Sequence, residues 1–149
     1  MTKIRLTKEF RFEMAHALHN YDGLCKNIHG HSYILQVTVI GTPCKKLDNP
    51  KLGMVMDFGH LKAIVNDEIV SKLDHAVVVP DSYPEYQIKN LGEITERVIV
   101  TNYQPTCENM LIDFAQLIQP RLPNDIELFS LKLYETANSF AEWYAQDNK

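Results

Sequence analysis

The stretch "IRLTKEFRFEMAHAL", residues 4–18, decides the fold class because hydrophobic and polar side chains alternate along it. Its apolar side chains share one face, interrupted at Lys8: Ile4, Leu6, Phe10, Phe12 and Met14. The opposite face is polar or charged: Arg5, Thr7, Glu9, Arg11 and Glu13. A period of two residues is typical of a β-strand with one buried face. We therefore expect a long half-buried strand, whose apolar face continues to His16.

The stretch "HSYILQVTVIG", residues 31–41, predicts a second strand of the same kind. Its apolar face carries Tyr33, Leu35, Val37 and Val39. His29 and His31 continue the parity of that face toward the N-terminus. The segment 20–27 between the two stretches contains Asp22, Gly23 and Asn27, which favour a loop. The two strands are therefore expected to pair antiparallel.

Two helices and two further strands follow in the sequence. Asp57 is the expected N-cap of a helix to about Leu73, and Thr106 caps a second helix that ends near Pro120. "IELFSLKLYET", residues 126–136, predicts a third strand with Phe129, Leu131 and Leu133 on one face. "SFAEWYA", residues 139–145, predicts a short fourth strand.

The order strand-strand-helix-helix-strand-strand indicates an α+β fold, a four-stranded antiparallel sheet with two helices on one face. Residues 76–104 form an insertion in this order. Within it, "AVVV" and "RVIV" predict an extra hairpin around a long polar loop at 80–97.

Length, charge and cysteine content limit the class of protein. A chain of 149 residues suits one domain, residues 1–149. A net charge of −4 provides no overall basic field for nucleic acid or a membrane surface. Three cysteines without a CxxC motif do not suggest a disulfide framework. Because the N-terminus lacks an apolar signal and no long apolar run occurs, we expect a cytoplasmic protein.

Three histidines predict a metal site. Residues i and i+2 of a strand point to the same side, so His29 and His31 can face one ion. His16 lies at the loop end of the preceding strand, so the antiparallel pair would bring three imidazoles together. Three imidazoles suit Zn²⁺ and leave a coordination position for substrate.

Two other interpretations of the histidines remain. In the first interpretation, the three histidines are separate hydrogen-bonded side chains. In the second interpretation, His29 and His31 belong to a cupin barrel, which requires a carboxylate three or four residues after the second histidine. Ile34 and Leu35 occupy those positions, which weakens that interpretation. No Cys, Asp or Glu stands at a fixed spacing that would close a structural zinc site.

Cys25, the pair Asp74–His75 and Glu135 are the further candidates. A nearby cation favours the thiolate form of a cysteine, which can act as base or nucleophile. His75 beside Asp74 suits a proton relay, or a helix C-terminal histidine that stabilises the helix dipole. Glu135 continues an apolar strand face, where a carboxylate needs a partner, such as a ligand with two parallel N–H donors. A strand-end ion pair is the alternative for Glu135.

Taken together, these motifs resemble the 6-pyruvoyl-tetrahydropterin synthase family, including its bacterial 6-carboxy-tetrahydropterin synthase branch. The resemblance covers most of the chain and rests on the order and spacing of six segments: "FEMAHAL", "CKNIHGHSY", "MDFGHLK", "LDH", "PTCEN" and "LYETANS". It implies the tunnelling (T) fold, in which trimers close a barrel and two trimers stack into a hexamer. The stretch between His75 and Thr106 departs from the family, being longer than in short bacterial members.

The resemblance also implies roles for individual residues. His16, His29 and His31 match the zinc ligands, Cys25 the catalytic cysteine, and Asp74 and His75 a catalytic pair supplied by a neighbouring subunit. Glu135 matches the glutamate that anchors the pterin, and Thr106 lines the pterin pocket. The implied substrate is 7,8-dihydroneopterin triphosphate.

The three-residue gap between Cys25 and His29 resembles the carboxy-forming branch. It favours a 6-carboxy-5,6,7,8-tetrahydropterin synthase of queuosine precursor biosynthesis, which releases triphosphate and acetaldehyde. Two alternatives remain. One is a 6-pyruvoyl-tetrahydropterin synthase of the biopterin pathway, and the other is a non-catalytic, zinc-stabilised pterin-binding protein.

Overall fold

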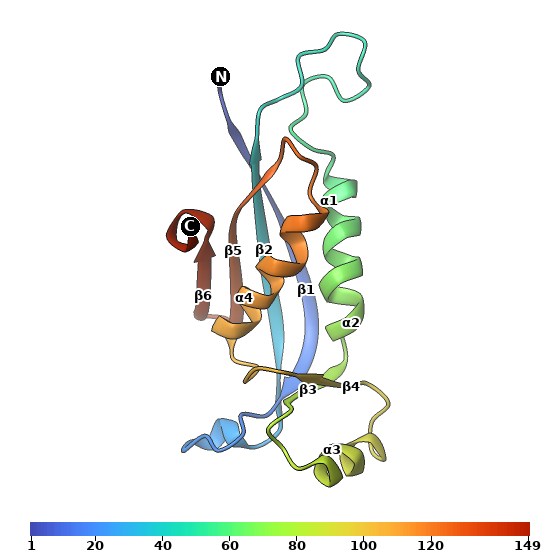
Figure 1. Ribbon diagram of the computed structural model, residues 1–149, viewed down its shortest axis with the longest axis vertical. Coiled ribbons are helices and arrows are strands. Elements are labelled where there is room, and N and C mark those ends of the chain that lie inside the picture. Colours follow the sequence, from blue (N-terminus) through green and yellow to red (C-terminus); the bar gives the residue numbers. More distant parts are fainter.

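A six-stranded sheet forms the long axis of the computed structural model, which describes residues 1–149 (Figure 1). Its strand order is β4-β3-β1-β2-β5-β6. The two longest strands, β1 (Ile4–His16) and β2 (His29–Gly41), pair antiparallel along their whole length. This confirms the α+β class and the predicted first pair of strands.

The predicted count of four strands and the predicted hairpin in the insertion are wrong. The insertion contains β3 (Ala76–Pro80) and β4 (Val98–Thr101), joined through helix α3 (Glu85–Gly92). β3 pairs parallel with β1, and β4 pairs parallel with β3. A connection that contains a helix is long enough to return the chain to the start of the neighbouring strand, which a parallel pair requires.

The two principal helices begin at the predicted caps. Helix α1 (Phe58–Val65) continues through a π-helical segment, Asn66–Val70, into α2 (Ser71–Leu73), and the Asp57 carboxylate accepts a hydrogen bond from the Gly59 N–H at its start. Helix α4 (Cys107–Ile118) begins where the Thr106 hydroxyl accepts from the Asn109 N–H. Its C-terminus passes into a 3₁₀ turn at Gln119–Arg121.

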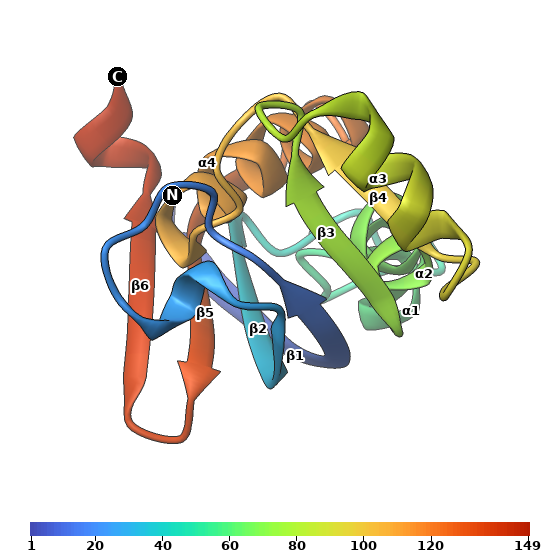
Figure 2. The ribbon, with the colours of Figure 1, turned by 90° about the horizontal axis from the view of Figure 1, so that it is seen from below.

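These helices cover one face of the sheet, and the hydrophobic core lies between them and the central strands (Figure 2). The fully buried side chains include members of both layers: Leu35, Val37, Val39, Leu61, Val65, Ile69, Ile118, Leu131 and Leu133. Burial of the alternating face of β2 confirms its predicted orientation. None of the helices has the length and hydrophobicity needed to cross a bilayer.

The predicted face of Phe129 is wrong. β5 (Glu127–Thr136) pairs antiparallel with β2, but the register shifts between Thr38 and Val39, so that Leu128 takes a buried position. A bulge places an extra residue in one strand and changes the alternation beyond it. Phe129 consequently contacts Arg5, whose guanidinium carbon lies 3.9 Å from the ring centroid.

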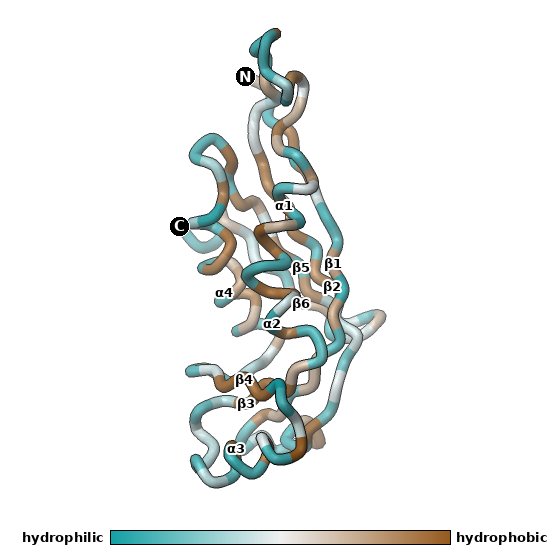
Figure 3. Tube along the Cα trace, turned by 90° about the vertical axis from the view of Figure 1, so that its right-hand side faces the viewer, coloured by the Kyte–Doolittle hydropathy of each residue, from teal (hydrophilic) through white to brown (hydrophobic).

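β6 (Ser139–Tyr144) forms the edge of the sheet beyond β5, and a short 3₁₀ turn, Ala145–Asn148, follows it. The loop 42–57 and helix α3 lie at opposite ends of the long axis (Figures 1 and 3). The candidate histidines lie toward the α3 end, where β1 ends and β2 begins.

Candidate metal centre

Three predicted histidines come together at the end of the β1–β2 pair. His16 and His29 are direct cross-strand partners, and His31 follows two residues along β2. The Nε2 atoms of His16 and His29 are 3.1 Å apart. The ring centroids of the three side chains lie 4.6 to 5.2 Å from one another. The convergence predicted from strand parity is therefore present in the structure.

Glu135 adds a fourth donor to this cluster. Its Oε1 atom lies 2.9 Å from His31 Nε2 and 3.7 Å from His16 Nε2. One ligand atom from each of the four side chains lies within 4.8 Å of all the others. Spacing along the sequence did not reveal this fourth donor, because Glu135 lies on β5, which is far from β2 in the sequence and becomes its neighbour only in the folded sheet. Its position on an apolar strand face was the signal in the sequence.

Backbone carbonyls define which ring nitrogens face the cluster. The Nδ1 atoms of His16 and His29 lie 2.7 Å from the carbonyl oxygens of Pro105 and Asn27. A carbonyl only accepts, so each Nδ1 carries the proton and each Nε2 keeps a free lone pair. Two such lone pairs 3.1 Å apart repel one another unless a cation lies between them. The donor set therefore fits Zn²⁺, for which neutral imidazoles with a second-shell hydrogen bond are usual ligands.

Burial favours the neutral form of His16 and His31. His16 is 1% exposed, and this burial lowers its pKa below the ordinary value. Burial also lowers the pKa of His31, while the Glu135 charge acts in the opposite direction. The buried His31 Nε2 atom has no well-aligned hydrogen-bond partner. A metal binds the lone pair of an unprotonated ring nitrogen, so neutral imidazoles whose nitrogens lack a hydrogen-bond partner are suited to coordinate one.

Tyr33 borders the cluster and was interpreted from the sequence as a core residue only. Its ring stacks on Phe12 at 5.2 Å and meets His31 edge-on at 5.5 Å. The hydroxyl is buried without a hydrogen-bond partner, and burial raises its pKa. Such a hydroxyl is rare in folded proteins, because an unsatisfied buried polar group is costly. Its parity with His31 along β2 was the available signal.

Cys25 lies in the short 3₁₀ turn Leu24–Lys26 of the loop between β1 and β2, and it is partly buried. Its carbonyl accepts a hydrogen bond from the Leu18 N–H, which ties this turn to the end of β1. Cys107 is different, since its thiol is buried against the Leu133 carbonyl and burial raises its pKa to about 12. Cys25 is therefore the thiol that stands in the histidine loop with access to solvent.

Asp74 and His75 form a pair directly after α2. Asp74 Oδ2 lies 3.1 Å from His75 Nδ1, and Asp74 Oδ1 accepts a hydrogen bond from the Glu13 N–H. That N–H holds the pKa of Asp74 below its ordinary value. His75 has a left-handed backbone with a φ of 61°, and its N–H donates to the Glu13 carbonyl. The Asp74 carboxylate and the His75 backbone are thus both tied to Glu13 of β1.

The exposed His75 ring does not join the four-donor cluster of its own chain. It lines a surface hollow with Glu13 and Ser32, whose side chains alternate with those of Met14 and His31. Alternation along a strand places Glu13 and Ser32 on the sheet face away from the helices. The structure therefore leaves the Asp74–His75 pair outside the four-donor cluster of its own chain, although His31 also lines this hollow.

Thr106 links α4 to the cluster. Its hydroxyl serves as the N-cap, and the preceding Pro105 carbonyl accepts from His16. The residue is partly buried. The start of α4 is thereby held beside the His16 ring.

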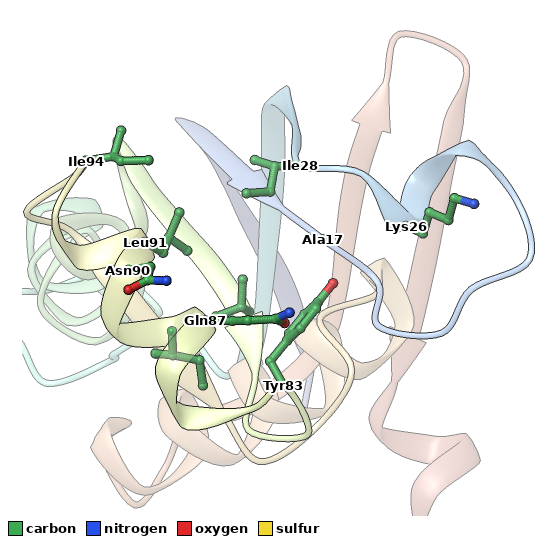
Figure 4. Close-up of a pocket in the computed structure, with 10 residues that line it drawn as sticks. Ala17, Lys26, Ile28, Tyr83, Gln87, Asn90, Leu91 and Ile94 are labelled. Atoms are coloured by element: carbon green, nitrogen blue, oxygen red, sulfur yellow. The ribbon is translucent and has the colours of Figure 1, made fainter.

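The insertion builds a second cavity near the Cys25 loop. Helix α3 contributes Gln87, Asn90 and Leu91, and the loop contributes Lys26 and Ile28, around a mostly apolar volume of about 280 Å³ (Figure 4). His19 stacks on Tyr83 with 4.2 Å between the ring centroids, and its Nδ1 lies 2.8 Å from Ser82 Oγ. The segment that lengthens this chain is therefore packed against the end of β1 and the loop that follows it.

Comparisons with known proteins show what this chain is similar to in sequence and fold. The family model described as 6-pyruvoyl tetrahydropterin synthase matches residues 5–146. A 6-carboxy-5,6,7,8-tetrahydropterin synthase from Haemophilus influenzae is 36% identical over 143 residues, covering 93% of this chain and 97% of the relative. One from Synechocystis is 43% identical over 139 residues, covering 93% and 91%. The 6-pyruvoyl tetrahydropterin synthase structure from Caenorhabditis elegans has the same fold, with a TM-score of 0.70, 23% identity and 97% of each chain covered.

Proposed function

Since the chain belongs to the 6-pyruvoyl tetrahydropterin synthase family, we propose that it is a zinc-dependent 6-carboxy-5,6,7,8-tetrahydropterin synthase. Its substrate is 7,8-dihydroneopterin triphosphate, and the reaction releases triphosphate and acetaldehyde in the synthesis of a queuosine precursor. The observation that carries this proposal is the group of His16, His29 and His31, with their Nε2 atoms directed at one point beside Glu135.

The histidine cluster is the proposed zinc site. His16, His29 and His31 hold the ion through neutral rings whose orientation the backbone carbonyls set. Zinc, when bound, supplies a Lewis acid that acidifies the C–H bonds beside the substrate's side-chain hydroxyls. The protein's part is to hold the substrate side chain and to move its protons.

Cys25 is the proposed base, since it stands in the loop that leads directly into His29. It takes a proton from the substrate side chain, and His75, oriented by Asp74, carries another. A thiol with this role must remain reduced, which fits a cytoplasmic location.

Glu135 is the proposed anchor of the pterin. Its carboxylate is within reach of solvent, at 27% side-chain exposure, while the aliphatic neighbour Leu133 is buried. A carboxylate can accept two parallel N–H bonds from an amino-pyrimidine edge, which fixes the ring in one orientation. Thr106, at the start of α4, lines the same pocket.

The open edges of the sheet support a T-fold oligomer. β6 has one free edge, and β1 has a free edge along Ile4–Glu13, because β3 pairs only with Met14–His16. Long unpaired strands are usually covered in soluble proteins. We expect β1 of one subunit to pair with β6 of the next in a trimeric barrel, and two trimers to stack. A neighbouring chain then brings Asp74 and His75 to the site, which explains their separation from the cluster within one chain.

The carboxy-forming reaction is favoured over the 6-pyruvoyl product by the gap of three residues between Cys25 and His29. The names of the relatives from Haemophilus influenzae and Synechocystis support the same choice. A non-catalytic pterin-binding protein would not require a solvent-accessible thiol in the histidine loop or an oriented Asp74–His75 pair.

Incubation of the purified protein with 7,8-dihydroneopterin triphosphate and mass analysis of the products test the proposal. A 6-carboxy-tetrahydropterin product together with acetaldehyde is expected. A 6-pyruvoyl product would replace the proposal with the biopterin-pathway enzyme. Unreacted substrate together with retained pterin binding would indicate a non-catalytic pterin-binding protein.

A further inference from the structure

The position of Glu135 matches a metal ligand more closely than a group waiting for a pterin. Zinc–nitrogen bonds of about 2.0–2.1 Å in a tetrahedral site place neighbouring donor atoms roughly 3.3 Å apart. Three donor distances here are close to that value, at 3.1 Å for His16 to His29, 2.9 Å for Glu135 to His31 and 3.7 Å for Glu135 to His16, and all four donors lie within 4.8 Å of one another. Glu135 therefore supplies a fourth donor to a site otherwise built from imidazoles.

Nothing else holds the carboxylate in this position. Its only polar contacts are those with His31 and His16. The side chain is partly exposed, so a ligand can reach it, whereas His16 behind it is sealed from solvent. A glutamate with one set of contacts and access to solvent is free to change rotamer when a better partner arrives.

The two tasks of Glu135 exclude one another. Bidentate pairing with an amino-pyrimidine edge uses both carboxylate oxygens and requires them to face the ring. In the structure, Oε1 faces the imidazole nitrogens instead. One carboxylate cannot serve the metal and the pterin edge in the same rotamer.

We propose that Glu135 is an exchangeable fourth ligand, which coordinates the metal in the substrate-free enzyme and leaves it to bind the pterin edge. This inference rests on the proposed function. A site with four protein ligands is closed, whereas catalysis needs an open position. Withdrawal of Glu135 by the pterin opens that position at the moment when the substrate side chain can fill it.

The exchange has a thermodynamic consequence. If the metal and the pterin compete for Glu135, each lowers the affinity of the protein for the other by the same factor. The carboxylate also offsets part of the charge that a divalent ion brings to three neutral rings. Zinc is therefore bound more tightly in the resting enzyme than in a complex with a pterin that has no side-chain hydroxyl.

The test uses 6-methylpterin, which has the amino-pyrimidine edge but no side-chain hydroxyl that could reach the metal. Zinc affinity is measured by competition with a chromogenic chelator, and coordination is followed by the visible spectrum of the Co²⁺-loaded protein. Glu135→Ala should weaken zinc binding at least about tenfold, since even second-shell changes cost 10- to 100-fold. Saturating 6-methylpterin should change the Co²⁺ spectrum and weaken zinc binding in the wild type, and do neither in Glu135→Ala.

Glu127→Ala is the matched control, because it removes another carboxylate of β5, which pairs only with Lys3 at the far end of the strand. It should behave as the wild type in every measurement. Glu135→Gln serves if the alanine variant does not fold, since it preserves side-chain length.

Equal zinc affinity in wild type and both Glu135 variants would overturn the fourth ligand. An unchanged Co²⁺ spectrum in wild type at saturating 6-methylpterin, or no binding of that compound, would overturn the exchange. These outcomes are separate from the product analysis, which decides the proposed reaction on its own.

Discussion

At the residue scale, two backbone carbonyls orient the imidazole nitrogens of the candidate metal site. Pro105 and Asn27 each accept a hydrogen bond from an Nδ1–H, so that His16 and His29 present Nε2 lone pairs to the same point. The site is thus organised before any ion arrives, and its histidines are not interchangeable with others on the surface. His60, for example, lies exposed on α1.

Purified protein should therefore contain about one Zn²⁺ per chain, and His29→Ala should lose most of it, because only two of the three imidazoles that hold the ion permanently would remain. Elemental analysis after dialysis measures the content. His60→Ala is the control and should keep its zinc. Full occupancy in His29→Ala would refute the site.

Cys25→Ala should retain fold and zinc but lose turnover by about 10²–10⁴, the usual contribution of a general base. Steady-state kinetics and circular dichroism measure the two properties. Cys44→Ala, outside the histidine loop, should remain as active as the wild type. Unchanged turnover in Cys25→Ala would assign the proton transfer to another group.

The orphan hydroxyl of Tyr33 gives a prediction about stability. Tyr33→Phe should raise the free energy of unfolding of the metal-free protein by about 1 kcal/mol, since it removes a buried polar group without a partner and keeps the ring. Urea denaturation in the presence of a chelator measures the change. A loss of stability of the same size would show that the hydroxyl has a partner.

At the element scale, the N-terminus of α4 connects helix stability to the metal site. Thr106 caps the helix, and the adjacent Pro105 carbonyl holds His16. Thr106→Ala should lower the free energy of unfolding by about 1 kcal/mol, the usual value of a lost N-cap. Thr106→Ser retains the hydroxyl and should restore the stability, as thermal unfolding can show. Equal stability of the alanine and serine variants would contradict the capping role.

At the scale of the whole molecule, the proposed trimer shares each active site between two subunits. Cys25→Ala and His75→Ala should each be inactive. When the two variants are mixed in equal amounts and exchange subunits, about one site in four of a closed symmetric ring should contain both an intact Cys25 and an intact His75. Activity should recover to about a quarter of the wild-type value.

Native mass spectrometry establishes whether mixed oligomers have formed. Background activity in confirmed mixed oligomers would place Cys25 and His75 of the same chain in one site. That result would contradict the proposed arrangement of subunits but leave the zinc site unaffected.

The sequence alone determined the features that depend on local periodicity and short loops. Alternation along residues 4–18 and 31–41 predicted both strands, and the parity of His16, His29 and His31 predicted their meeting. Asp57 and Thr106 predicted the helix starts, because an N-cap acts on backbone groups only two or three residues away.

Only the tertiary structure decided features that depend on register between distant segments. The position of Glu135 beside His31 follows from the pairing of β5 with β2, and the changed face of Phe129 follows from a bulge in that pairing. Hydrophobic pattern likewise carries no information about strand direction, so the hairpin predicted for these two segments was wrong and β3 and β4 proved parallel. Alternation reports which face of a strand is buried, whereas neighbours, direction and register are properties of the assembled sheet.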